Sequence, residues 1–84
     1  MLQLRRAASS IPANIAEGHG RGGDAEFARY LKIAAGSACE LEYHLLLARD
    51  LGYLPARDHE GMEEKVVEVK RMLSSFVSKL RADS

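Results

Sequence analysis

Apolar residues recur at helical spacing along nearly the whole chain. Four of them in the first third fall on one side of a helix: Leu4, Ala8, Ile11 and Ile15. Pro12 interrupts this segment, because proline has no N–H and its ring crowds the carbonyl four residues earlier, so we expect a kink or a break near Ser10. Glycines at positions 18, 20, 22 and 23 then end the helix, and Gly18 is the expected left-handed residue beyond it.

A longer helix is predicted from about Ala25 to Leu51. Asp24 stands at the position of an N-cap, and Gly52 follows the end of the helix. Its main apolar stripe consists of Phe27, Tyr30, Leu31, Ala34, Ala38, Leu41, Leu45 and Ala48. A second stripe, about a third of a turn away, consists of Ile33, Ser37, Glu40, His44, Leu47 and Leu51. A helix that is apolar on more than one face packs against more than one neighbour.

A third helix is predicted after Pro55, which is tolerated in a first helical turn. Its apolar seam has the four-three spacing of a helix in a bundle: Met62, Val66, Val69, Leu73, Phe76 and Leu80. The sequence has no strand-like alternation, internal repeat or low-complexity segment. It therefore predicts one all-α domain over residues 1–84, an antiparallel up-down helical bundle with three helices.

Composition indicates a soluble domain that gains from association. The chain has 84 residues, of which 46% are hydrophobic and 29% charged. A domain of this size buries only about 60 to 65% of the surface that its unfolded chain exposes, so self-association is a common source of its stability. Cys39 is the single cysteine, which fits a reducing compartment. No apolar run approaches 18 residues and no signal-peptide pattern is present, so we expect a cytoplasmic protein without a membrane partner.

Charge is balanced in total but uneven along the chain. Residues 1–32 carry five bases and three acids, residues 33–69 three bases and eight acids, and residues 70–84 four bases and one acid. Two interpretations remain open. The charges are solvated helix faces, or two basic segments flank an acidic one and meet an anionic partner.

The residues that carry chemistry form no recognisable catalytic or metal site. The glycine turn "GHGRGG" lacks the pattern of a phosphate-binding loop, and no strand is predicted before it. Glu40 and His44 are four residues apart and could share a metal, although such a pair more often forms a hydrogen bond. Cys39 has no evident partner base. We therefore expect no enzymatic activity, no cofactor and no metal.

Two segments carry a family resemblance: "RRAASSIPANIAEG" and the following "GRGGDAEFARYLKIAAGSACELEYHLLLARDLGYL". They resemble the four-helix-bundle family first named for proteins encoded in intervening sequences of bacterial 23S rRNA genes, to which the accessory protein of diversity-generating retroelements is related. The resemblance covers about residues 3–54, and the last helix by its pattern. The matching positions are Ser10, Pro12, Asn14, Ile15, Ala16, Glu17, Gly18, Phe27, Leu31, Ala34, Gly36, Ser37, Glu40 and Leu41.

The resemblance implies an antiparallel bundle that assembles into a ring, typically a homopentamer, without enzymatic activity. It also implies nucleic-acid binding, which is a property of relatives. Family members carry a further helix before the first of the two segments. The resemblance therefore implies a four-helix fold, and three explanations for its first helix remain open: the start codon is assigned late, the helix is lost, or another subunit supplies equivalent packing.

Two sets of residues are the candidates for function. For nucleic-acid binding they are Arg5, Arg6, Arg21, Arg29 and Lys32. For a structural or interface role they are Ser10, Pro12, Asn14, Glu17, Ser37 and Glu40. We expect the polar stripe of the first helix, which includes Arg6, to meet Ser37 and Glu40 across a helix contact, because buried polar groups require partners.

Two functions follow from these residues. The first is a ring-forming adaptor that binds RNA or DNA through a basic surface. The second is a structural scaffold that binds another protein. It is favoured by the zero net charge, the absence of Trp and the small number of Phe and Tyr residues, which leave few rings on which bases could stack.

Overall fold

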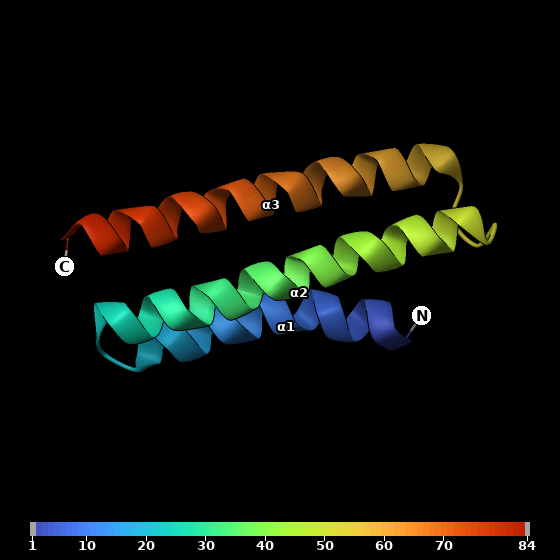
Figure 1. Cartoon of the computed structure of the whole chain (residues 1–84). Helices are drawn as coiled ribbons and strands as arrows, with labels where there is room; N and C mark the ends of the chain where they lie inside the picture. Colours follow the sequence, from blue (N-terminus) through green and yellow to red (C-terminus); the bar gives the residue numbers. More distant parts are fainter. Residues whose placement is uncertain (1, 84) are drawn as a thin grey trace.

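The computed structural model consists of three antiparallel helices (Figure 1). They are α1 (Leu2–Gly20), α2 (Asp24–Asp50) and α3 (Ala56–Asp83). The structure describes the backbone of residues 2–83 and the side chains of residues 4–82. Within that backbone there is no strand, so the predicted all-α antiparallel architecture is confirmed.

The first helix runs without interruption through Pro12. The break that we expected near Ser10 is therefore absent. Ile11 and Ile15, on either side of the proline, pack against the core cluster of Leu31 and its neighbours. This packing offsets the cost of the one backbone hydrogen bond that proline removes.

The α1–α2 turn differs from its predicted form at both ends. The helix continues to Gly20, and the residue with a positive φ of 83° is Gly22 rather than Gly18. At the start of α2 the N-cap is Gly23, in an extended conformation and without a side-chain capping bond, so Asp24 is the first helical residue. The sequence placed both the end of α1 and the start of α2 too close to the apolar residues of each helix. Gly18 was taken as the end of α1 because sequence alone did not show that it packs against α2.

Gly18 allows the two helices to approach closely. A Cβ atom at this position would lie 2.6 Å from Cβ of Tyr30 and 3.1 Å from Cδ1 of Phe27. Both separations are shorter than ordinary van der Waals contacts. The glycine that seemed to end α1 therefore sets the distance between α1 and α2.

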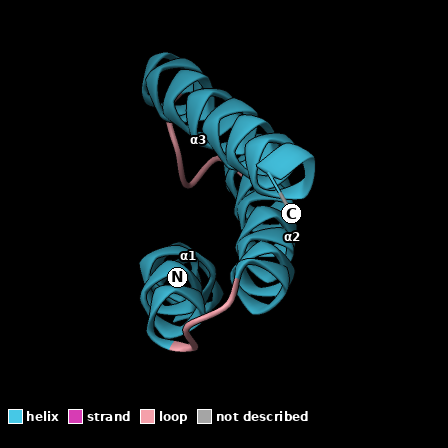
Figure 2. Cartoon of the chain, turned by 90° about the vertical axis from the view of Figure 1, so that its left-hand side faces the viewer, coloured by secondary structure: helices cyan, strands magenta, loops and turns pink. Residues whose placement is uncertain are grey.

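The second helix lies between the other two. In the described part of the chain α1 and α3 each pack on α2, and their backbones do not approach one another (Figure 2). Two core clusters follow α2: Leu31, Ala34 and Leu73 form one, and Ala38, Leu45 and Val66 form the other.

A hydrogen bond of 2.8 Å joins Lys70 Nζ on α3 to Glu42 Oε1 on α2. This bond raises the pKa of the Lys70 ammonium above its usual value. Because the ammonium is already charged at neutral pH, the stability that this raised pKa contributes is present there and is lost as the pH rises through the pKa of Lys70.

The surface between α1 and α3 remains uncovered, and we call it the open face. It is defined by a groove to which all three helices contribute: Leu4, Arg5, Ala8, Leu41, Leu45, Met62, Lys65 and Val66. Met62 is 45% exposed. The second stripe of α2, a third of a turn away, is also exposed, since Ile33, Leu47 and Leu51 keep 42%, 41% and 61% of their surfaces in solvent. One chain therefore leaves apolar surface exposed at the groove and along the second stripe of α2, as the two stripes in the sequence indicate.

Candidate nucleic-acid interface

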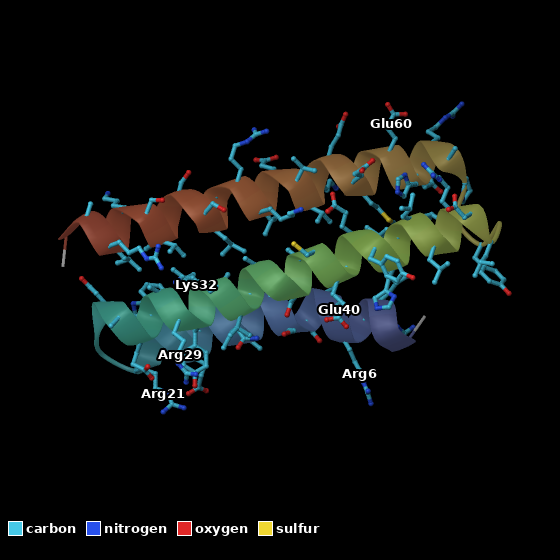
Figure 3. The ribbon with its side chains drawn as sticks, viewed as in Figure 1. Arg6, Arg21, Arg29, Lys32, Glu40 and Glu60 are labelled. Carbon is cyan, nitrogen blue, oxygen red and sulfur yellow. The ribbon has the colours of Figure 1, made fainter. Side chains whose placement is uncertain are left out.

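The five candidate bases are divided between two ends of the molecule. Arg21, Arg29 and Lys32 lie at the end formed by the α1–α2 turn (Figure 3). Arg6 lies toward the N-terminal end of α1 and points away from the helices. Arg5 precedes it in the chain and lines the groove of the open face. The candidates thus do not form a single patch.

The C-terminal part of α3 adds positive charge at the α1–α2 turn, because α2 and α3 are antiparallel (Figure 1). Arg81 of α3 lines a shallow depression together with Arg29, Lys32 and Asp24 of α2. Sequence reasoning missed Arg81, since 49 residues separate it from Lys32. We call the end that carries Arg21, Arg29, Lys32 and Arg81 the basic end.

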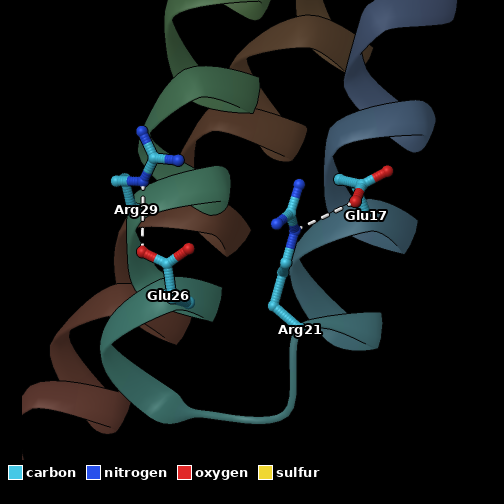
Figure 4. Close-up of polar contacts among 4 residues, drawn as sticks. All are labelled: Glu17, Arg21, Glu26 and Arg29. Carbon is cyan, nitrogen blue, oxygen red and sulfur yellow. Dashed lines mark hydrogen bonds and ion pairs between the residues drawn. The ribbon is translucent and has the colours of Figure 1, made fainter.

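Arg21 and Arg29 form ion pairs with nearby carboxylates (Figure 4). Arg21 Nε donates to Glu17 Oε2 at 3.0 Å, and Arg29 Nε donates to Glu26 Oε1 at 3.3 Å. All four side chains are about half exposed, between 47% and 59%. Exposed pairs of this kind contribute about 0 to 1 kcal/mol, so a phosphate can compete for the guanidinium groups.

The same two arginines lie over one aromatic ring. Their Cζ atoms are 5.4 Å (Arg21) and 5.0 Å (Arg29) from the centre of the Tyr30 ring, within the range of cation–π interaction. Sequence reasoning placed Tyr30 in the apolar stripe of α2 and gave it no further role. No local signal identifies the contact with Arg21, because it depends on how α1 and α2 are aligned.

The polar stripe of α1 makes a smaller network than expected. Ser10 Oγ lies 2.8 Å from Ser37 Oγ of α2, and the Asn14 amide donates to both Oγ and the backbone carbonyl of Ser10 at 2.9 and 2.8 Å. Glu17 is turned to Arg21 instead, and Arg6 has no ion pair among the described side chains.

The remaining two structural candidates lie outside this network. Glu40 is 67% exposed on its side chain, and its Oε1 lies 3.8 Å from His44 Nε2. Pro12 lies on an exposed part of α1. The helix contact therefore joins Ser10, Asn14 and Ser37, and the acidic residues of the stripe remain at its margins.

Replacing Ser37 by alanine should lower the free energy of unfolding by about 1 kcal/mol, because the substitution removes the partner of a half-buried hydroxyl. Ser9→Ala is the matched control, since the Ser9 hydroxyl makes an exposed bond of 3.3 Å to the carbonyl of Arg6 within its own helix. Urea unfolding monitored by circular dichroism measures both. Equal effects at the two positions would contradict a role for the Ser10–Ser37 contact.

The described residues include no group of three or more His, Cys, Asp or Glu side chains that could hold a metal ion. Cys39 is exposed and free. Among the described helices, none has the length and apolar character needed to cross a membrane.

Comparison with known proteins places this arrangement in a family. The model of the family described as 23S rRNA-intervening sequence protein matches residues 1–75. The fold is similar to the crystal structure of a protein with unknown function from the S23 ribosomal protein family of Bacteroides thetaiotaomicron. The TM-score is 0.86 and the sequence identity 32%, over 89% of this chain and 69% of that chain. A comparison with curated protein sequences gives no match. On the family match and the shared helical fold, the chain belongs to the 23S rRNA-intervening sequence proteins.

Proposed function

We propose that this protein is a non-enzymatic helical scaffold of the cytoplasm that forms an oligomeric ring and binds nucleic acid through its basic end. The observation that carries the binding function is the arrangement of Arg21, Arg29, Lys32 and Arg81 at one end of the molecule. No cofactor or metal takes part in this function.

The open face supports assembly. Its groove exposes apolar side chains from all three helices, and its two charged lining residues, Arg5 and Lys65, come from opposite walls. Apolar surface of this kind on a small domain is a usual sign of an interface. A second copy that covers the groove would add the buried surface that three helices alone lack. Five copies in a ring are the assembly that the family resemblance implies.

Repetition around a ring compensates for the modest charge of one subunit. At the basic end, Glu17 and Glu26 partly neutralise Arg21 and Arg29. Several copies bound to one nucleic acid strengthen binding by avidity without any new contact. Phosphate contacts carry no sequence information, so binding should tolerate sequence changes and weaken steeply as salt rises. The family description, which refers to an intervening sequence of 23S rRNA, favours RNA as the first ligand to test.

The second candidate is a scaffold that binds another protein and no nucleic acid. The observation in its favour is the second stripe of α2, where Ile33, Leu47 and Leu51 are exposed, together with the exposed Tyr43 one turn before Leu47. Such a surface suits an apolar partner better than a phosphate backbone.

The triple substitution Arg21→Gln, Arg29→Gln and Lys32→Gln should weaken binding to duplex RNA while the oligomer persists. Each lost phosphate contact reduces the slope of log K against log salt by about 0.9 in magnitude, so the triple variant should show a visibly flatter salt dependence. Fluorescence anisotropy with a labelled RNA hairpin measures the affinity, and light scattering measures the mass.

The matched control removes three exposed arginines elsewhere: Arg49→Gln, Arg57→Gln and Arg71→Gln. It has the same net charge as the test variant. If the wild-type protein binds neither duplex nor structured RNA or DNA at low salt, the protein-binding scaffold becomes the better assignment.

A further inference from the structure

We propose that Arg21 and Arg29, held over the ring of Tyr30, form a two-guanidinium clamp for a single phosphodiester group. This inference rests on the proposed function, because it names the group of the nucleic acid that the basic end binds. The clamp differs from a general basic surface in one respect. Its affinity depends on an uncharged residue, Tyr30, as well as on the two charges.

The α1–α2 turn fixes the position of all three side chains. Tyr30 lies at a close approach of α1 and α2, opposite Gly18. The backbone N–H of Arg21 donates to the carbonyl of the same glycine at 3.2 Å, which holds the start of the turn. Arg29 directly precedes Tyr30 on α2. The ring and both guanidinium groups are thus positioned by one short segment before any ligand arrives, which lowers the entropic cost of binding.

The two carboxylates leave the terminal guanidinium nitrogens of Arg21 and Arg29 available to bind a ligand. Glu17 and Glu26 each accept a hydrogen bond from Nε, and no other hydrogen bond to these two guanidinium groups is found among the described residues. In Figure 4 the terminal nitrogens of each arginine point away from its carboxylate. Terminal guanidinium nitrogens bind phosphate oxygens in a planar fork, which an ammonium group does not reproduce.

The two guanidinium groups lie close enough to one ring to offer donors to the same anion. Both Cζ atoms are within 5.4 Å of the centre of the Tyr30 ring, and the carboxylate paired with each arginine is about half exposed, so solvent screens it. A phosphodiester with its two unesterified oxygens can accept hydrogen bonds from both arginines. Lys32 takes no part in this clamp, because only Arg21 and Arg29 lie over the Tyr30 ring among the described residues.

Two pairs of arginine substitutions distinguish the clamp from a general effect of positive charge. Arg21→Gln with Arg29→Gln should weaken binding of the labelled RNA hairpin by about tenfold or more, since charge-assisted hydrogen bonds are lost at both positions. The control pair, Arg49→Gln with Arg57→Gln, removes the same charge at the other end of α2 and should weaken binding by less than about threefold. Equal losses in the two pairs would overturn the clamp.

The decisive variants are those at Tyr30, since they leave the net charge unchanged. Tyr30→Leu should weaken binding by a factor comparable to one arginine substitution, whereas Tyr30→Phe, which keeps the ring, should bind as the wild type does. Circular dichroism checks that both variants are folded. RNA binding by a folded Tyr30→Leu variant at wild-type affinity would overturn the proposal, and so would a Tyr30→Phe variant as weak as Tyr30→Leu.

A second measurement distinguishes failure of the clamp from failure of the proposed function. The probe is the dinucleotide UpU, which contains one phosphodiester, and uridine is the control without phosphate. UpU should shift the Nε–H NMR signals of Arg21 and Arg29 in the full chain, and uridine should not. If RNA binds but UpU moves neither signal, the clamp is wrong and the proposed function stands. If UpU moves both signals but no nucleic acid binds, the clamp is supported and the proposed function is wrong.

Discussion

Replacing Ala8 and Met62 by glutamate is expected to convert the oligomer into folded monomers. These residues lie on opposite walls of the open face, one on α1 and one on α3. Both are exposed in the single chain, Met62 by 45%, so the new carboxylates remain hydrated in a monomer. An interface over the groove would bury them without partners, and the effective penalty for burying an unpaired ion is several kcal/mol. Association should therefore be lost while helicity remains.

The matched control introduces the same charges away from the groove. Ser9→Glu with Tyr53→Glu adds one carboxylate to α1 and one to the α2–α3 turn, where Tyr53 is 75% exposed. Light scattering and circular dichroism at micromolar concentration measure mass and fold for each protein. A wild-type protein that is itself a folded monomer would refute assembly. An Ala8→Glu, Met62→Glu variant that retains the wild-type mass would exclude the open face as the interface.

The helices were predictable because their apolar period is long and unbroken. The expected range of residues 25–51 differs by one residue at each end from the observed α2, and Gly52 has a φ of 82° that suits a glycine after a helix. Of the two effects expected from Pro12, a kink or a break, the break is absent, since the packing of Ile11 and Ile15 offsets one missing hydrogen bond. The apolar period of a helix is a signal from many residues, whereas a break in a helix depends on a single residue and its surroundings.

The candidate site was predictable in part for the same reason. Ser10 belongs to the polar stripe of the first helix, which we expected to contact Ser37. The structure places the hydroxyl oxygens of the two serines 2.8 Å apart. Tyr30 and Arg81 had no comparable signal. Their neighbours at the basic end come from other helices, so the contacts depend on the alignment of α1 with α2 and of α2 with α3. Sequence separation alone does not determine that alignment.

Gly18→Ala is expected to destabilise the protein by about 1 to 2 kcal/mol, although alanine is the better helix former. The added methyl group would lie 2.6 Å from Cβ of Tyr30. That atom is bonded directly to the backbone, so it cannot rotate away as the Phe27 ring can, and α1 and α2 must separate. The strain of overpacking thus exceeds the gain of up to about 1 kcal/mol in helix propensity.

Gly20→Ala provides the matched comparison within the same helix. A methyl group at Gly20 would meet no atom within 4 Å, so the gain in helix propensity should appear undiminished and the protein should become slightly more stable. Urea unfolding should therefore place the two variants on opposite sides of the wild type. Since Tyr30 moves with α2, Gly18→Ala should also weaken RNA binding, although it changes no charge, whereas Gly20→Ala should not. If both alanine variants are equally stable, the close approach at Gly18 does not hold the helices together, and the basis for the fixed position of Tyr30 is lost.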